Sequence, residues 1–398
     1  MRLKLPRLLF VALISLAVPA LVQAQRDIGS VDVMTANKTI PITVSSSNAE
    51  LNRLANFAFE AHGAFRRVSS GALYNVQFTP VGAVQVKVDV LRGGTLALSQ
   101  VVSGSSTRNA LWRAADLAVK TMSGLNGIFS AQLTFISERD GKPEVYTGDL
   151  FFGGVRQWTF DKTQAMTPRW SPDGRRIVYT SYYRTGYPDI FMIDVNTQQR
   201  SQFVNFKGVN SSARFSPDGQ RVAMVLSGEG NPEIYVSNAQ GRSVTRLTRT
   251  SAVEASPAFS PDGSRIVFTS DSAGGPQLYV MSSRGGSATR LPTNISGYCA
   301  EPDWSRADPN KIAFTMRIGS GFQIGLFDLS TRAAAKQVSK APVDAVEPAW
   351  LGDGRHLVFT ARAANTRSIW MLDTETGKAT RLSGNELGKV SQANVLLP

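Results

Sequence analysis

The chain has 398 residues, a formal net charge of +13 and an apolar content of 42%. This length is sufficient for two domains, each with its own core. Lys and Arg are dispersed among Asp and Glu with no run of five like charges, which disfavours a nucleic-acid groove. With one cysteine and two histidines far apart in sequence, we expect neither an internal disulfide nor a histidine-rich metal site.

The first 24 residues have the pattern of a signal peptide. Three basic residues, Arg2, Lys4 and Arg7, precede an apolar stretch over residues 8–18 that is too short to span a bilayer. Small residues before and at Ala24 indicate a cleavage site there. We therefore predict an exported chain, and the absence of a disulfide pair favours the bacterial periplasm. A retained membrane anchor is the alternative.

Residues 25–127 predict a small α+β domain. A capping box at Ser47 and Glu50 introduces a helix over residues 48–65. Alternating segments at 84–90 and 96–102 flank a glycine turn and predict a hairpin. Thr107 is the expected cap of a second helix. The segment 25–45 is either a strand of this domain or a partly free arm.

From residue 128 onwards the sequence repeats with a period of about 45 residues. Trp-Ser-Pro-Asp-Gly over 170–174 returns as Phe-Ser-Pro-Asp-Gly over 215–219 and 259–263, and in weaker form at 304–305 and 350–354. Pro fixes φ, Asp bonds back to the backbone and Gly accepts positive φ, so each copy predicts a tight turn. The aspartate is interpreted as a turn former and not as a calcium ligand.

Short alternating strands follow each turn, which is typical of four-stranded β-propeller blades. A further repeat over residues 131–159 lacks the leading turn. We therefore predict a mainly β chain, in which residues 128–398 form a six-bladed β-propeller preceded by the α+β domain. Residues 391–397 are predicted to pair beside residues 131–137, because a closed ring leaves no exposed sheet edge.

The sequence offers little for catalysis. No nucleophile elbow, phosphate loop or dinucleotide fingerprint is present. We expect His62, near a helix end, and His356, at a strand start, to be exposed, and a Cys299–His356 nucleophile pair is disfavoured. The prediction is a protein without enzymatic activity, cofactor or metal.

Two alternatives stay open. One is an exported propeller related to the non-catalytic domain of a peptidase. The other is a propeller that binds cell-wall glycans through stacked indole rings. Four of the five candidate tryptophans occupy blade-packing positions, which favours a core role; the five are Trp158, Trp170, Trp304, Trp350 and Trp370.

The repeats, the junction Leu-Asn-Gly-Ile-Phe-Ser over 125–130 and the domain order resemble the TolB family, periplasmic propeller proteins of the Tol-Pal system. The resemblance implies a monomeric, non-enzymatic scaffold that supports outer-membrane integrity and constriction during cell division. The short span between Arg66 and Val84 implies a reduced N-terminal domain.

The resemblance also implies two partner sites. A Pal-like peptidoglycan-associated lipoprotein is expected in loops at one channel mouth, at residues that share one phase of the repeat: Thr167, Asn210, Ser212, Ala255, Ser256, Glu301 and Glu347. A TolA-like inner-membrane protein is expected at the N-terminal arm, at Asp27, Ile28, Val31 and Val33.

Overall fold

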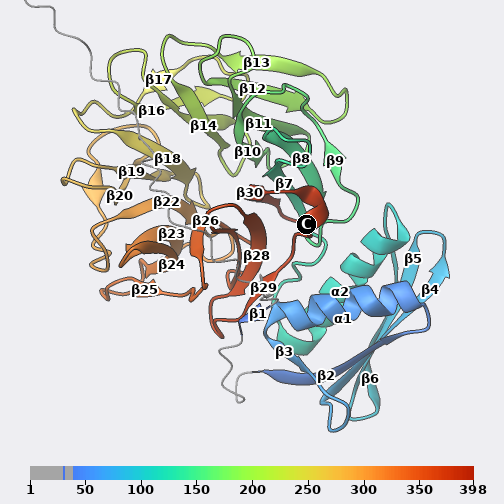
Figure 1. Cartoon of the computed structure of the whole chain (residues 1–398). Coiled ribbons are helices and arrows are strands. Elements are labelled where there is room, and N and C mark those ends of the chain that lie inside the picture. The colour runs from blue at the N-terminus through green and yellow to red at the C-terminus, as the bar shows by residue number, and fades with distance from the viewer. Residues whose placement is uncertain (1–29, 32–38) are drawn as a thin grey trace, which may run out of the picture.

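The computed structural model describes residues 30–31 and 39–398. Six β-sheets surround a central channel, and an α/β domain lies beside the ring, against the blade that carries β28 and β29 (Figure 1). The predicted six-bladed propeller is thus confirmed, and the α+β domain predicted before it is a domain with a mixed sheet and two helices. The predicted signal peptide, residues 1–24, lies outside the described residues.

Five blades follow the chain order from the innermost strand outwards, with antiparallel neighbours. Their strands are β10 (Ala165–Trp170), β11 (Arg176–Ser181), β12 (Asp189–Asp194) and β13 (Arg200–Val204); β14 (Asn210–Phe215), β15 (Arg221–Leu226), β16 (Glu233–Asn238) and β17 (Thr245–Arg246); β18 (Glu254–Phe259), β19 (Arg265–Ser270), β20 (Gln277–Ser282) and β21 (Thr289–Arg290); β22 (Cys299–Trp304), β23 (Lys311–Ile318), β24 (Gly321–Asp328) and β25 (Lys336–Gln337); β26 (Asp344–Trp350), β27 (His356–Arg362), β28 (Arg367–Asp373) and β29 (Ala379–Arg381).

The sixth blade is shared between the two ends of the propeller sequence. It contains β7 (Gln132–Ser137), β8 (Glu144–Asp149) and β9 (Arg156–Gln157), and its inner strand is β30 (Val390–Leu396), which follows the 3-10 helix η2 (Asn385–Leu387). Val390 lies opposite Ser137 and Leu396 lies opposite Gln132. The predicted closure is therefore confirmed, and it removes the two edges that an open ring would expose.

The Ser-Pro-Asp-Gly motif acts as a turn. The Ser171 hydroxyl donates to Asp173 Oδ1 at 2.5 Å and accepts from the Arg176 amide at 2.9 Å. Gly174 has φ 69°, the left-handed conformation that favours glycine. Ser216 and Ser260 make the same contacts in the next two blades.

The N-terminal domain is a five-stranded mixed sheet in the order β3-β2-β4-β5-β6, with both helices on one face (Figure 1). Its elements are β2 (Ile40–Ser46), α1 (Ala49–His62), β3 (Phe65–Arg67), β4 (Tyr74–Gly82), β5 (Gln85–Arg92), β6 (Thr95–Ser103) and α2 (Thr107–Ser123). The β5–β6 hairpin matches the prediction. None of the helices in the described part of the chain is long and apolar enough to cross a membrane.

Both helix caps differ from the prediction by one residue. The side chain of Asn48, not Ser47, accepts from the Leu51 amide at 3.0 Å. Ser106 caps α2 by accepting from the Asn109 amide at 3.1 Å, so Thr107 is the first helical residue. In both cases the capping residue is the last one with extended backbone, which places its side chain over the free amides.

Candidate functional site: the channel and the interdomain joint

One residue of each inner strand lines the central channel with a positive φ between 50° and 57°. We call these six residues the channel ring: Thr167, Ser212, Ser256, Glu301, Glu347 and Gln392. Each lies in a β-bulge, where the pairing register with the next strand shifts. The expectation that five of them, all but Gln392, lie in loops is wrong, because the bulge turns these side chains into the channel within the strand itself.

The residue that follows the ring position favours the bulge in most blades. It is proline in four inner strands, at positions 168, 257, 302 and 348. Proline has no N–H group, so the interruption of the ladder leaves no donor unpaired at that residue.

Ring residues connect neighbouring blades. The backbone N–H of Glu347 donates to Thr315 Oγ1 of the preceding blade at 3.1 Å, and the N–H of Gln392 donates to Thr360 Oγ1 at 3.1 Å. The Glu347 carboxylate accepts from the Thr360 hydroxyl at 2.7 Å and from the Gln392 amide at 3.1 Å. Burial, followed by the charge of Glu347, raises the pKa of Glu301. These polar groups therefore hold the channel wall in a fixed geometry.

Ring residues and a second layer below them enclose a cavity of about 80 Å³. The second layer includes Arg169 and Arg214, and Arg214 forms an ion pair with Asp303. Arg169 donates to the Pro168 carbonyl at 3.2 Å, and burial together with the charge of Arg214 lowers its pKa to about 10. The channel mouth therefore presents positively charged donors, from arginine, and negatively charged acceptors, from glutamate, to a loop that enters it.

Two predicted site residues lie elsewhere. Asn210 is fully buried, and its amide donates to Asp189 Oδ1 at 3.1 Å and to the Phe206 carbonyl at 2.6 Å. Ala255 is half-buried, pairs with Thr269 and does not line the cavity. Sequence reasoning missed Gln392, although the 45-residue spacing from Glu347 gives its position.

The predicted arm residues fall mostly outside the description. Val31 lies in β1 (Ser30–Val31), which pairs antiparallel with β29 so that Val31 is opposite Ala379. Asp27, Ile28 and Val33 lie outside the described residues.

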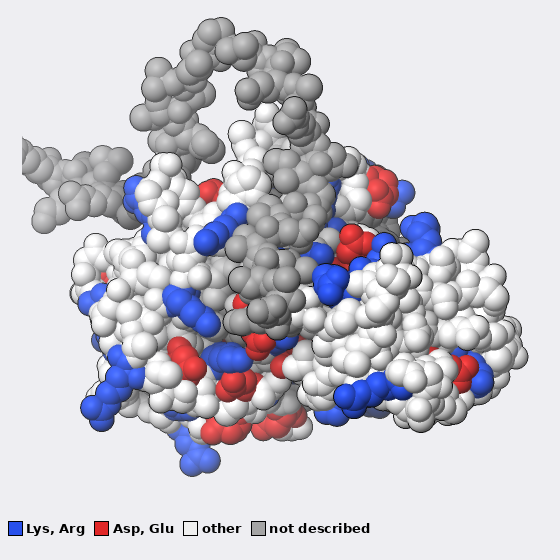
Figure 2. Space-filling view, turned by 90° about the horizontal axis from the view of Figure 1, so that it is seen from below, with Lys and Arg blue, Asp and Glu red and all other residues white. Residues whose placement is uncertain are grey.

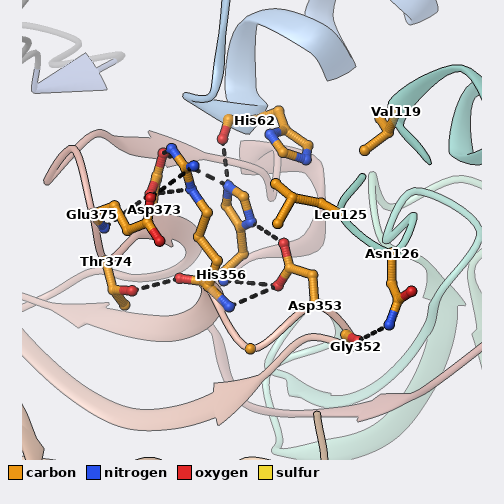
Figure 3. Close-up of polar contacts among 12 residues, drawn as sticks. His62, Val119, Leu125, Asn126, Gly352, Asp353, His356, Asp373, Thr374 and Glu375 are labelled. Carbon is orange, nitrogen blue, oxygen red and sulfur yellow. Dashed lines mark hydrogen bonds and ion pairs between the residues drawn. The ribbon is translucent and has the colours of Figure 1, made fainter. Parts of the chain in front are cut away.

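Buried histidines from both domains meet at the interdomain joint (Figure 3). His62 ends α1 and His356 begins β27; both are fully buried, and their ring centroids are 4.2 Å apart. The expectation that both are exposed and distant is wrong, because the C-terminal end of α1 docks on the blade of β26–β29. Asn126 adds a bond to the Gly352 carbonyl at 3.3 Å.

The surroundings of His356 identify its charge state. Its Nδ1 lies 2.5 Å from Asp353 Oδ2, and its Nε2 bonds to the carbonyl oxygen of His62. A carbonyl oxygen only accepts, so Nε2 carries a proton. Burial is the largest influence on His356 and opposes the charged form. The charges of Asp353 and Asp373, with the hydrogen bonds to Asp353 and to the His62 carbonyl, together outweigh burial and raise the pKa of His356. Burial would raise the pKa of Asp353, but the charge and hydrogen bonds of His356 lower it. His356 is therefore an imidazolium.

His62 is neutral. Neither of its ring nitrogens has a hydrogen-bond partner among residues 30–31 and 39–398, and burial followed by the charge of His356 lowers its pKa well below the ordinary value. His62, Asp353 and His356 place ligand atoms within 4.8 Å of one another, a composition that could hold a metal. Both nitrogens of His356 already face bonded oxygens, so the geometry fits hydrogen bonds and we assign no metal here.

Nucleophilic catalysis by Cys299 and glycan binding by stacked tryptophans find little support. Cys299 is buried beside Thr293, and burial raises the pKa of its thiol, which disfavours the thiolate that a nucleophile needs. Trp170, Trp304, Trp350 and Trp370 are buried in the propeller core. On the face shown in Figure 2, basic and acidic side chains are interspersed, as the sequence indicates.

Comparison with known proteins agrees with this architecture. Residues 119–393 match the family model described as the TolB beta propeller domain. The chain is 31% identical over 129 residues to the Tol-Pal system protein TolB of Alcanivorax borkumensis, which is 32% of this chain and 30% of that protein. The matched segment thus spans about a third of the length of such curated relatives.

Solved structures extend the likeness in fold to nearly the whole chain. TolB from Acinetobacter baumannii matches with a TM-score of 0.81 at 22% identity, over 93% of this chain and 99% of that one. A putative TolB from Agrobacterium tumefaciens matches with a TM-score of 0.52 at 18% identity, over 64% and 88%. The expected reduction of the N-terminal domain finds no support in the 99% coverage. Because the family model covers well over half of the chain, this protein belongs to the TolB β-propeller family.

Proposed function

We propose that the protein is a non-enzymatic periplasmic scaffold of the Tol-Pal type, exported by a signal peptide that is cleaved near Ala24. Its propeller, residues 128–398, holds a Pal-like peptidoglycan-associated lipoprotein at the channel mouth. The N-terminal arm, with Asp27, Ile28, Val31 and Val33, contacts a TolA-like inner-membrane protein. Together these contacts support outer-membrane integrity and constriction during cell division.

The observation that carries the proposal is the channel ring. Six blades each contribute one positive-φ residue to one cavity, and five of these residues are the predicted Thr167, Ser212, Ser256, Glu301 and Glu347. A single convergent surface of fixed hydrogen-bonding groups suits protein recognition, because little ordering is needed on binding. Asn210 and Ala255 do not line this cavity and are left out of the proposed contact.

Calorimetry with a purified Pal-like lipoprotein tests the proposal. Ser256→Arg places a bulky charge in the cavity without altering a blade core, so we expect at least tenfold weaker binding, about 1.4 kcal/mol, at an unchanged melting temperature. Leu96→Arg, on an exposed position of the N-terminal domain, is the matched control and should bind normally. Full-strength binding by Ser256→Arg would remove the interface from the channel, and hydrolysis of peptide or glycan substrates by the wild type would contradict the non-enzymatic assignment.

A further inference from the structure

An exposed aromatic patch lies beside the channel mouth. Phe160 is 71% exposed, Tyr187 is 69%, Phe206 is 49% and Tyr183 is 45%, although these side chains are among the largest apolar groups of the chain. They lie on three connections at the end of the propeller where the inner strands begin. The β9–β10 and β13–β14 connections lead into inner strands, and the β11–β12 connection leaves β11 at Ser181, which pairs with Ala165, the first residue of β10. Exposed apolar groups gathered in this way are typical of interaction surfaces.

Buried bonds hold these connections in place. The Asn210 backbone amide donates to the Pro188 carbonyl at 2.9 Å, while its side chain binds the Phe206 carbonyl and Asp189. Arg200 lies over the Tyr183 ring at 3.9 Å and forms an ion pair with Asp161, next to Phe160. The patch is therefore preorganised, and Asn210 links two of its three connections through hydrogen bonds.

A cavity of about 500 Å³ opens between two of these connections. Tyr187 lines one side and Phe206 and Lys207 line the other. This volume is in the range of cavities that take up a small group, and two aromatic walls suit an apolar side chain.

The exposed charged side chains around the patch are positive. Lys162, Arg184 and Lys207 are exposed on the same three connections, and none of them has an ion-pair partner within the described residues. Three acids nearby are already engaged among the described residues. Asp161 pairs with Arg200, Asp189 is buried against Asn210, and Glu144 is buried and accepts from the backbone N–H of Lys162 at 2.7 Å. An aromatic surface edged by unpaired lysine and arginine complements an acidic partner.

We propose that this patch is a second contact surface for the same lipoprotein, which places an apolar side chain between Tyr187 and Phe206 and acidic side chains against Lys162, Arg184 and Lys207. The inference rests on the proposed function, since it extends the contact at the channel mouth to the adjoining blades. Aromatic anchors at the centre of an interface commonly carry most of its binding energy, and peripheral charges mainly accelerate association.

Surface variants of the full chain, titrated with the Pal-like lipoprotein, test the inference. Tyr187→Ser and Phe206→Ser should each weaken binding at least tenfold. Lys207→Glu should weaken it about threefold and reduce its dependence on salt. The matched controls are Leu96→Ser, at an exposed apolar residue of β6, and Arg332→Glu, at an exposed residue of the β24–β25 connection at the opposite end of the propeller strands; both should bind like the wild type. Because all these side chains are exposed, melting temperatures should not change.

Each outcome decides the inference. If Ser256→Arg loses binding while the patch variants bind normally, the patch is not part of the interface and the proposed function stands. If the wild type does not bind the lipoprotein, both the function and the patch assignment are wrong. Binding of the wild type to phosphatidylglycerol vesicles that is lost in Tyr187→Ser would assign the patch to a lipid surface and overturn a protein contact.

Discussion

The channel and the interdomain joint are both built from buried polar groups, yet they differ in repetition. In the channel, the same backbone amide and the same threonine position recur from blade to blade. In the joint, one imidazolium lies between Asp353 and the end of α1. The stability of the channel wall is therefore shared among several equivalent hydrogen bonds, whereas the stability of the joint depends on the protonation of one histidine, His356. Loss of a single polar group should therefore matter little in the channel and much in the joint.

Removal of a whole strand is the largest perturbation of the ring. Truncation after Glu386 deletes β30, so the β7 ladder, the ring residue Gln392 and the burial of Val390 and Val395 are lost together. Each of these buried side chains contributes about 1.5–3 kcal/mol, so we expect a loss of several kcal/mol. Chemical unfolding measures it, and an unchanged midpoint would show that β30 does not close the ring.

Among single substitutions, we expect a change at His356 in the joint to lower the free energy of unfolding the most. His356→Leu leaves the Asp353 carboxylate buried without its partner, which typically costs about 3–5 kcal/mol. The free energy of unfolding, measured with denaturant, checks this value. The double variant His356→Leu with Asp353→Asn should recover part of the loss, because it removes the unpaired charge. A loss equal to the sum of the two single variants would mean that the residues do not interact.

Protonation should give the joint a stability maximum near pH 6.5, the ordinary pKa of histidine. The pKa of His356 is raised in the folded state, so its contribution is complete below pH 6.5 and is lost as pH rises through the folded value. The pKa of His62 is lowered, so its contribution is present above pH 6.5 and is lost as pH falls below that value. Asp353, Asp373 and Arg355 face the same pair.

Unfolding curves measured across pH separate the loss of stability above pH 6.5 from the loss below it. His356→Gln should remove the decline on the alkaline side, and His62→Leu should remove the decline on the acidic side. Parallel pH profiles for wild type and both variants would mean that neither histidine changes its protonation on folding.

A single change in the channel should have the smallest effect. Thr360→Val removes one hydroxyl that donates to Glu347 and accepts from the Gln392 amide, a loss of about 1 kcal/mol. Val225 already occupies the corresponding position of β15, which shows that the wall tolerates an apolar side chain there. A loss as large as that of His356→Leu would contradict the contrast between channel and joint.

The same contrast explains what could be predicted from the sequence. Blades, turns, closure and most of the channel ring followed from the 45-residue phase, because a repeated position gives a repeated environment. The phase did not separate Ser256, which lines the cavity, from Ala255, one residue earlier, because the bulge decides which side chain enters the channel. Asn210 begins an inner strand at the channel mouth, but its side-chain amide donates to Asp189 inside the propeller and does not face the cavity.

The joint could not be predicted, because it has no pattern. His62 and His356 are 294 residues apart and belong to different domains. A histidine near a helix end is usually solvated, and only the docking of α1 on the propeller buries this one. The aromatic patch is also unique to three connections, so its exposure became visible only in the structure.

Hydrogen exchange of the protein with and without the Pal-like lipoprotein tests the central claim most directly, because it locates the contact without any substitution. We expect slower exchange in the inner strands around Ser256, Glu301 and Glu347 and in the connections that carry Tyr187 and Phe206, with no change in β5 and β6. Protection confined to the N-terminal sheet, with unchanged exchange at the channel mouth, would contradict the assignment of the propeller as the lipoprotein-binding surface.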